Sequence, residues 1–283
     1  MEDSEFQLAQ RKLMAAASKD FVCFLHVMWP QVEGVDYILS RLHNYLAELV
    51  QEVITGRRRR NQSVSVPPQH GKSRLLCVRA VAFLVGFKPN VHIAMTGFSH
   101  SLLSEFLDEV KDIIASPRYQ AIFPNIQPVV GRNRAGSVRF TNGASIQVKS
   151  SGSKLTGRKV DWLIVDDPHA GRFEAESPTS RRKIQQWFFG DCVTRLAPDA
   201  KTFVISTRWH PEDLHGLVTD PKEEDRLRDA GFEDELFEVT NLPALAEVDD
   251  PLGRELGEAL FPEQRDVRFL ESLKARMGFS ILR

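Results

Sequence analysis

The sequence has few cysteines, no excess of charge of either sign and no long apolar run. Its three cysteines, Cys23, Cys77 and Cys192, form neither a CxxC pair nor a metal-ligand spacing, which is typical of reduced thiols in a cytosol-like compartment. No apolar stretch approaches the length of a membrane span, and the acidic N-terminus lacks the cationic start of a secretion signal. These absences disfavour disulfide-rich, membrane-spanning and secreted proteins, and predict a soluble intracellular one.

The chain is nearly neutral overall. The formal net charge is −1, so a surface that binds nucleic acid would have to be a local patch. With 283 residues, of which 42% are apolar, the chain can bury a real core. This size fits one large α/β domain, or one domain with a small appendage.

The spacing of apolar residues changes along the chain. Up to Gly56 it is helical, and the basic run Arg57 to Arg60 follows at once. Beyond this point, apolar runs and alternation predict strands at 63–66, 91–96, 160–166 and 202–207, a hairpin with an Asn-Gly turn at 137–149, and helices at 75–86, 101–115 (stopped by Pro117) and 177–195. Strands separated by helices favour a mainly parallel, doubly wound sheet. From about residue 219 the chain becomes charged and irregular.

The first strand leads into a loop suited to binding phosphate. The segment is Pro67-Pro68-Gln69-His70-Gly71-Lys72-Ser73, and an apolar helix follows. Amides of such a loop and the helix N-terminus bind phosphate oxygens, a lysine reaches the β- and γ-phosphates, and a serine hydroxyl ligates Mg²⁺. Val66 stands where the usual first glycine would be, and a bare Gly-Lys-Ser is also common in solvated turns. The strand before it and the helix after it favour nucleotide binding by residues 68–73.

A second candidate site is the acidic end of the apolar strand 160–166. In a parallel sheet this end faces the ligand crevice, where Asp166 can hold Mg²⁺ and Asp167 can orient or deprotonate the attacking water. Glu174 and Glu176 are the alternative general bases, because related ATPases often use glutamate. The other interpretation is a turn, which Asp before Pro168 also favours.

The strand 202–207 ends in Ser206 and Thr207. These hydroxyl groups can bind the γ-phosphate or the lytic water and report hydrolysis to the rest of the chain. They can equally cap a following helix.

Taken in order, these motifs resemble those of a known family. PPQHGKS, then LIVDDP with FEAES, then ISTRWHPEDL, and the tail NLPALAEVDDPLGRELGEALFPE resemble the ATPase domain of tailed-bacteriophage terminase large subunits, from about residue 38 onward. The resemblance implies an α/β, RecA-like P-loop ATPase of the class with an extra catalytic acid. We expect a core at 1–240, whose residues 1–60 are helical, and a linker or small subdomain at 241–283.

The resemblance also implies ligands and partners. The ligands are ATP and Mg²⁺, and the partners are double-stranded DNA, a portal protein and a small terminase subunit. Copies of the chain are expected to assemble as a ring in the host cytoplasm, and the isolated chain can be a monomer. Large terminases carry a second, nuclease domain, and the chain ends too early for it, so DNA cleavage is not expected. The function so implied is ATP hydrolysis that drives duplex DNA into a procapsid. A helicase-like nucleic-acid ATPase, or a module that binds ATP to assemble a ring with little turnover, stays open.

Such catalysis also requires positive charge, often from an arginine. Gln69 occupies the loop position where terminases often have arginine, so Arg158 is the candidate, acting across a subunit boundary, and Arg208 is the second. For both, an ordinary surface arginine is an equal alternative. Arg57 to Arg60 and the basic group 181–183 can contact DNA or solvate the surface, and Tyr45 can stack on adenine or pack in the core.

Overall fold

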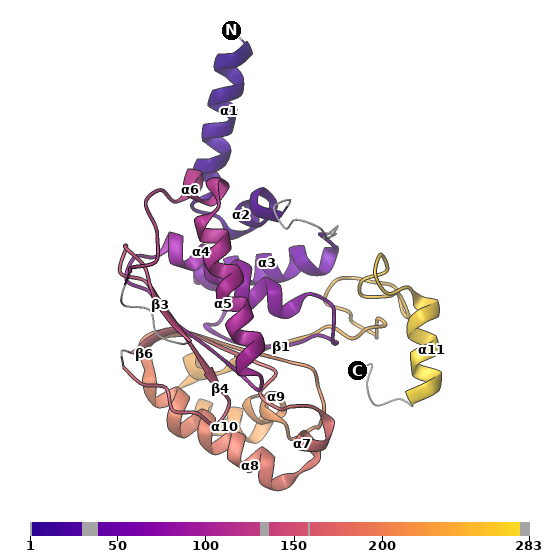
Figure 1. Ribbon diagram of the computed structural model, residues 1–283. Helices are drawn as coiled ribbons and strands as arrows, with labels where there is room; N and C mark the ends of the chain where they lie inside the picture. The colour runs from indigo at the N-terminus through magenta and orange to yellow at the C-terminus, as the bar shows by residue number, and fades with distance from the viewer. Residues whose placement is uncertain (1, 30–38, 131–135, 158, 278–283) are drawn as a thin grey trace.

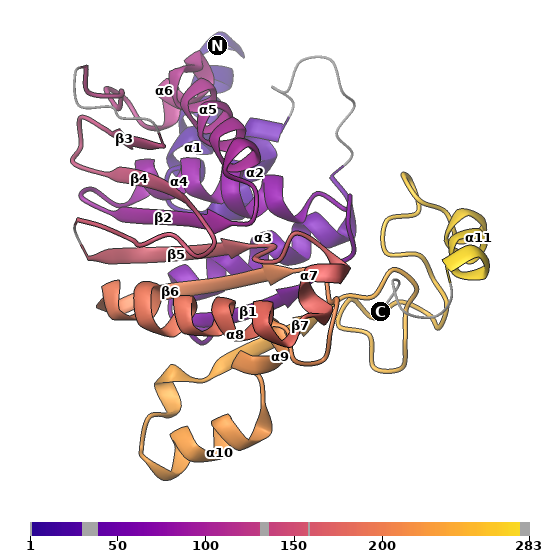
Figure 2. The ribbon, with the colours of Figure 1, turned by 60° about the horizontal axis from the view of Figure 1, so that its bottom comes forward.

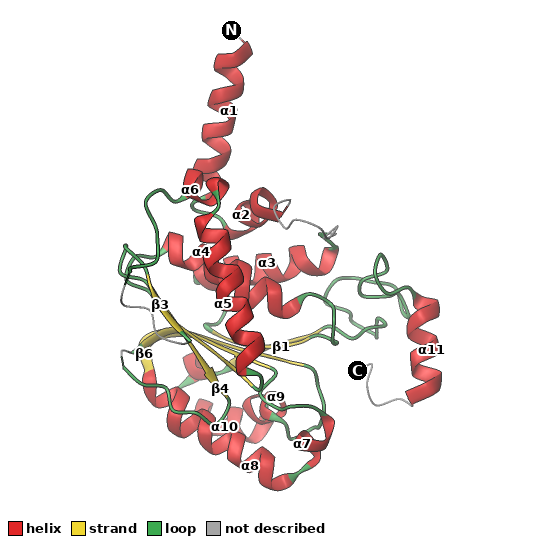
Figure 3. Cartoon of the chain, in the orientation of Figure 1, coloured by secondary structure: helices red, strands yellow, loops and turns green. Residues whose placement is uncertain are grey.

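A seven-stranded sheet with helices on both faces forms the centre of the protein, in a computed structural model that describes residues 2–29, 39–130, 136–157 and 159–277 (Figures 1 and 3). The strands are β1 (Asn61–Ser65), β2 (His92–Gly97), β3 (Ser137–Arg139), β4 (Ser145–Ser150), β5 (Val160–Asp166), β6 (Leu196–Ser206) and β7 (Phe237–Asn241). Their order is β3-β4-β2-β5-β6-β1-β7. Every neighbouring pair is parallel except the β3–β4 hairpin. The predicted α/β fold with a mainly parallel sheet is confirmed.

Helices connect the strands and precede them. They are α1 (Glu2–Ala17), α2 (Phe21–Met28), α3 (Arg41–Ile54), α4 (Ala80–Phe87), α5 (His100–Ala115), α6 (Pro117–Ile122), α7 (Arg172–Glu176), α8 (Pro178–Trp187), α9 (Leu214–Val218), α10 (Pro221–Asp229) and α11 (Val267–Met277). Short π-helical segments lie at Arg74–Arg79 and Phe188–Cys192, and 3₁₀ turns at Val193–Arg195 and Glu233–Glu235. Within the described ranges, no helix is both long and apolar enough to cross a membrane.

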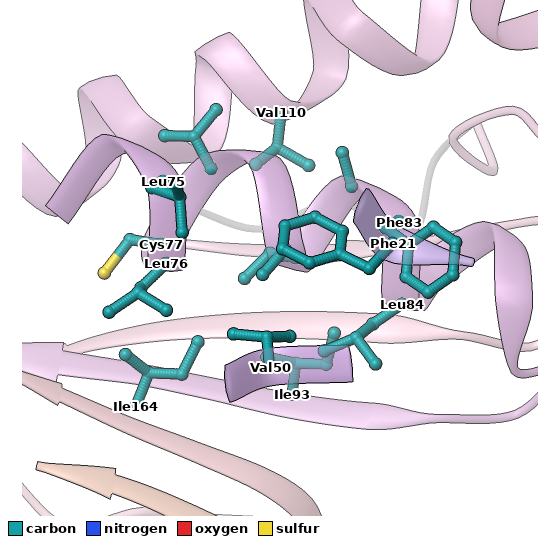
Figure 4. Close-up of a cluster of buried hydrophobic side chains, with 14 of the residues drawn as sticks. Phe21, Val50, Leu75, Leu76, Cys77, Phe83, Leu84, Ile93, Val110 and Ile164 are labelled. Carbon is teal, nitrogen blue, oxygen red and sulfur yellow. The ribbon is translucent and has the colours of Figure 1, made fainter. Parts of the chain in front are cut away.

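The sheet separates two apolar clusters, because alternate residues of a buried strand point to opposite faces. Trp162 and Ile164 of β5 belong to the larger cluster, whereas Leu163 and Val165 belong to the smaller one. Helices α3, α4 and α5 cover the first face and α8 covers the second (Figure 2). Figure 4 shows part of the larger cluster, in which helix side chains meet Ile93 and Ile164. Burial on both faces explains why the central strands are apolar runs.

The chain beyond residue 219 is more regular than its sequence predicts. β7 pairs in parallel with β1 over five residues, and Leu242 N continues the ladder to Ser65 O at 2.9 Å. The prediction of an irregular segment is wrong here. Among the residues of this edge strand only Thr240 is buried, so neither an apolar run nor alternation marks it.

Pro117 ends one helix and begins the next. α5 ends at Ala115 as predicted, because the residue before a proline is pushed into the extended conformation seen at Ser116, and Pro117 also opens α6 as its first residue. Ser116 caps α6, accepting a hydrogen bond from Tyr119 N at 3.3 Å. Proline is favoured at this position because its missing N–H would have no helical partner.

The segment after β7 lies beyond the carboxyl ends of the parallel strands (Figure 2). Leu242 and Leu260 join the larger apolar cluster, so this segment is packed onto the core. A separate small cluster contains Ala244, Ala259 and Leu270, the last of them from α11. The C-terminal segment therefore faces the loops that follow β1 and β5.

Candidate nucleotide site

The phosphate-binding loop connects β1 to the π-helical turn at Arg74. Gln69 and Gly71 have positive φ angles of 61° and 80°, which turn the chain back toward the helix. A Cβ at Gly71 would lie 2.5 Å from His43 Nε2, so close packing as well as the backbone angle requires glycine there. His70 Nδ1 lies 2.9 Å from Pro68 O, which holds the loop in a tight turn.

Lys72 is buried and points at the ends of two neighbouring strands. Its side chain is 5% exposed, and its Nζ lies 3.1 Å from Asp167 Oδ2 and 3.2 Å from Thr207 Oγ1. Loop, acidic strand end and hydroxyl strand end therefore meet at one point. Asp167 is 95 positions and Thr207 is 135 positions from Lys72 in the sequence. The neighbouring parallel strands β5, β6 and β1 bring the three residues together.

Ser73 and Asp166 form the next pair. Ser73 Oγ donates a hydrogen bond to Asp166 Oδ1 at 2.9 Å. Burial, and next the charge of Asp167, raise the pKa of Asp166 to about 7, against the opposing effects of Lys72 and the Ser73 hydrogen bond. A cation at this point would stabilise the carboxylate.

The donor set fits Mg²⁺. The ion is held in such sites by one or two carboxylates, a hydroxyl, waters and the substrate's phosphates, and seldom by an all-protein cage. Ser73 Oγ and Asp166 Oδ1 supply this kind of ligand. In the part of the chain that the structure describes, no cluster of three or more His, Cys, Asp or Glu side chains offers an alternative metal site.

Asp167 is held by the end of β6. Its Oδ1 accepts from Thr207 N at 2.8 Å, and its backbone N donates to Ile205 O at 2.8 Å. Its φ is +40°, in the left-handed region that aspartate and asparagine adopt more readily than most residues and that recurs at functional sites. The side chain is 38% exposed, so its carboxylate is open toward solvent beside the loop.

The alternative bases are engaged elsewhere. Glu174 Oε1 accepts from Ser180 Oγ at 3.0 Å and its Oε2 accepts from Ala170 N at 2.5 Å. Glu176 pairs with Arg172 at 2.6 Å. Both glutamates thus support α7 and the start of α8, whereas Asp167 contacts Lys72 directly.

Of the two arginine candidates, Arg158 lies outside the described residues. Arg208 Nε lies 3.5 Å from Asp213 Oδ1 and its Nη2 donates to Pro211 O at 3.4 Å, so it is bound within its own loop.

The basic run and Tyr45 also have structural surroundings. Arg58 pairs with Glu52 and Glu238, and Arg60 pairs with Asp234 and Glu235. The run precedes β1, at the opposite end of that strand from the phosphate loop. Tyr45 packs against the larger apolar cluster.

Two features of the site have no signal in the local sequence. Polar atoms of His169 and Ser206, without partners among the described residues, lie near a cavity of about 10 Å³ beside Asp167, the size that one water needs. Arg265, from the C-terminal segment, donates to Gln69 Oε1 across 196 positions. Neither the cavity nor the Arg265–Gln69 contact can be predicted without the fold, because the residues that form each of them are far apart in sequence.

The central parallel sheet, the strand–loop–helix around Lys72 and the acidic end of β5 define a P-loop NTPase. The family model for the terminase large subunit, T4likevirus-type, N-terminal, matches residues 64–277, and the chain belongs to this family. No curated protein gives a significant match.

Similar solved structures include large terminases and a large-terminase ATPase domain. The HK97 bacteriophage large terminase is 13% identical, with a TM-score of 0.55 over 88% of this chain and 51% of that one, so this chain spans about half its length. A mutant of the Thermus phage P74-26 large terminase ATPase domain is 14% identical, with a TM-score of 0.48 over 68% of this chain and 80% of that one. The large terminase of a thermophilic bacteriophage, in complex with ADP, is 12% identical, with a TM-score of 0.47 over 82% of this chain and 50% of that one.

Proposed function

We propose that this chain is a Mg²⁺-dependent ATPase that drives duplex DNA during viral genome packaging. The observation that carries the proposal is the meeting of Lys72, Asp167 and Thr207 within 3.2 Å, beside the Ser73–Asp166 pair. Membership of the terminase family supports the coupling to DNA.

Each side chain has a defined part in this proposal. Lys72 and the loop amides of residues 68–73 bind the phosphates, and Ser73 and Asp166 hold the metal. Mg²⁺, when bound, neutralises charge on the phosphate oxygens. Thr207 and Ser206 lie at the end of β6, where a change at the γ-phosphate is passed to the following loop.

Asp167 is the proposed general base. In the structure Lys72 neutralises its carboxylate at 3.1 Å, and a triphosphate would compete for the same ammonium group. Once Lys72 turns to the phosphates, Asp167 keeps the hydrogen bond from Thr207 N and gains a free oxygen. That oxygen can orient a water and accept its proton.

Family membership supports the proposed partners, which are duplex DNA, a portal protein, a small terminase subunit and further copies of the chain in a ring. We also propose a core at 1–240 and a small subdomain at 241–283, which agrees with the separate apolar cluster around Leu270.

ATP hydrolysis with Mg²⁺ tests the proposal. Lys72→Ala should abolish turnover, and Asp167→Asn should slow it by roughly 10²- to 10⁴-fold, the usual contribution of a general base. Asparagine tolerates the left-handed backbone at this position. Asp249→Asn is the matched control, since Asp249 is exposed and also has a positive φ, of 61°.

The outcomes separate the candidates. Full activity of Asp167→Asn would refute the base assignment and move it to Glu174 or Glu176. Specific activity that rises with protein concentration supports an arginine acting between subunits. Nucleotide binding with negligible turnover at every concentration would favour the ring-assembly module.

A further inference from the structure

Arg265 joins the C-terminal segment to the phosphate-binding loop. It precedes α11, and its Nη2 donates a hydrogen bond to Gln69 Oε1. Its guanidinium carbon lies 5.0 Å from the centre of the Phe269 ring, and its Nε is buried with no hydrogen-bond partner among the described residues. A guanidinium ion that is half-buried, with one donor given to a neutral amide and another unused, is incompletely satisfied.

The loop itself has little positive charge to offer. Within residues 67–73 Lys72 is the sole lysine or arginine, and it is paired with Asp167. Burial lowers the pKa of His70 to about 4, and the charge of Arg265 lowers it too, so this histidine is neutral near pH 7. Arg265 is therefore close enough for its charge to act on the loop, and a polyphosphate placed there would meet that charge.

We propose that Arg265 is a nucleotide-phosphate-binding residue, supplied from the C-terminal segment to a loop that has glutamine at position 69. This inference rests on the proposed function. On nucleotide binding, the guanidinium exchanges the neutral Gln69 oxygen for a phosphate oxygen. The exchange is favourable because the phosphate oxygen carries a negative charge and the Gln69 oxygen does not, so the guanidinium gains a Coulomb attraction at hydrogen-bond distance.

The exchange also links the segment after β7 to the nucleotide. Arg265 lies in the sequence between Phe261 and α11. The ring centres of Phe261 and His43 are 5.3 Å apart, and Leu270 of α11 belongs to the small apolar cluster. A contact from Arg265 to phosphate thereby fixes this segment over the carboxyl ends of the strands. Nucleotide should then protect residues 262–277 from hydrogen exchange.

Two substitutions separate charge from packing. Arg265→Gln keeps a side chain that can donate to Gln69 but removes the charge, whereas Arg265→Lys keeps the charge without the planar fork. We expect Arg265→Gln to weaken binding of fluorescent ATP and ADP analogues by about 10- to 100-fold, as for loss of a charged hydrogen bond. Arg265→Lys should recover part of that loss. Arg268→Ala, in the same segment and exposed, is the matched control and should bind like the unsubstituted chain.

The full chain is used throughout, with thermal unfolding to show that each variant is folded. Arg265→Gln binding as tightly as the unsubstituted chain would overturn the inference, as would an equal loss in Arg268→Ala. Unchanged hydrogen exchange at 262–277 on nucleotide addition would overturn it as well. If the unsubstituted chain binds no nucleotide, the proposed function fails, and this inference fails with it.

Discussion

At the scale of single residues, the shape of the phosphate-binding loop depends on glycine at position 71. Gly71 has a φ of 80°, and an added Cβ would lie 2.5 Å from His43 Nε2. Gly152 has a similar φ of 83°, but nothing lies within 4 Å of its added Cβ. The two glycines therefore separate backbone strain from steric contact.

We predict that Gly71→Ala destabilises the fold more than Gly152→Ala does. A left-handed alanine costs about 1–2 kcal/mol at either site, and at position 71 the contact with His43 adds to this. Denaturant unfolding of both variants gives the two free energies, and titration with a fluorescent nucleotide gives the affinity. Gly71→Ala should lose nucleotide binding and Gly152→Ala should keep it. Equal free energies of unfolding would show that the loop accommodates the methyl group.

The chemistry of the site is readable from residue types only in part. Lys72 and Ser73 follow a strand and a loop, and Asp166 ends an apolar strand. Such local patterns predict which end of a strand a side chain occupies. The choice among Asp167, Glu174 and Glu176 depends on which carboxylate meets Lys72, which is a property of the folded backbone.

At the scale of elements, the central strands and the edge strand differ in how far their sequences reveal them. β5 is buried on both faces, and its apolar run predicts it over its whole length. β7 is an edge strand whose residues are mostly exposed or half-buried, so its sequence resembles a charged loop. Helix α11 has the same difficulty, since most of its described side chains are solvent-accessible. Sequence patterning reports burial, and elements with little burial leave little pattern.

The basic run before β1 has ion-pair partners that the local sequence does not reveal. Arg58, 25% exposed, pairs with Glu52 of α3 at 2.5 Å and with Glu238 of β7 at 2.8 Å. These partners lie on both sides of the run in sequence, and one is 180 positions away. The run therefore fastens α3 and β7 to β1, in addition to any role at the surface.

We predict that Arg58→Ala lowers the free energy of unfolding by about 1 kcal/mol or more, because partly buried, charged hydrogen bonds are lost. Binding to duplex DNA at low salt should be unchanged. Thermal unfolding and a DNA-binding titration on the same samples check both parts. Arg57→Ala, at an exposed neighbouring position, is the control and should unfold like the unsubstituted chain. Weaker DNA binding with unchanged stability would instead assign the run to DNA contact.

At the scale of the whole molecule, buried titratable groups make stability depend on pH. Burial, as the main cause, lowers the pKa values of His43, His70 and His215 from 6.5 to about 4. The unfolded chain binds protons at these histidines from about pH 6.5 downward, whereas the folded chain does so only near pH 4. Their contribution to stability is thus complete above pH 6.5 and is lost as the pH falls. Asp166 acts in the opposite sense, since its pKa rises from 3.8 to about 7 and the folded chain retains its proton longer.

The balance between these groups decides the direction in which the free energy of unfolding changes with pH. Each pKa unit corresponds to about 1.4 kcal/mol, and three histidines outweigh one carboxyl group over nearly the same pH range. We expect the free energy of unfolding, measured without metal or nucleotide, to fall as the pH is lowered from 7 to 4.5. Asp166→Asn removes the group that opposes this trend, so the free energy of unfolding of this variant should change more steeply with pH. The variant should be more stable than the unsubstituted chain at pH 7.5, and this difference should be smaller at pH 4.5. His100→Gln, at an exposed position, should leave the curve unchanged. An unsubstituted chain that grows more stable toward pH 4.5 would mean that the histidines are charged inside the fold, and the neutral packing of His43 and His70 against the phosphate loop would then be wrong.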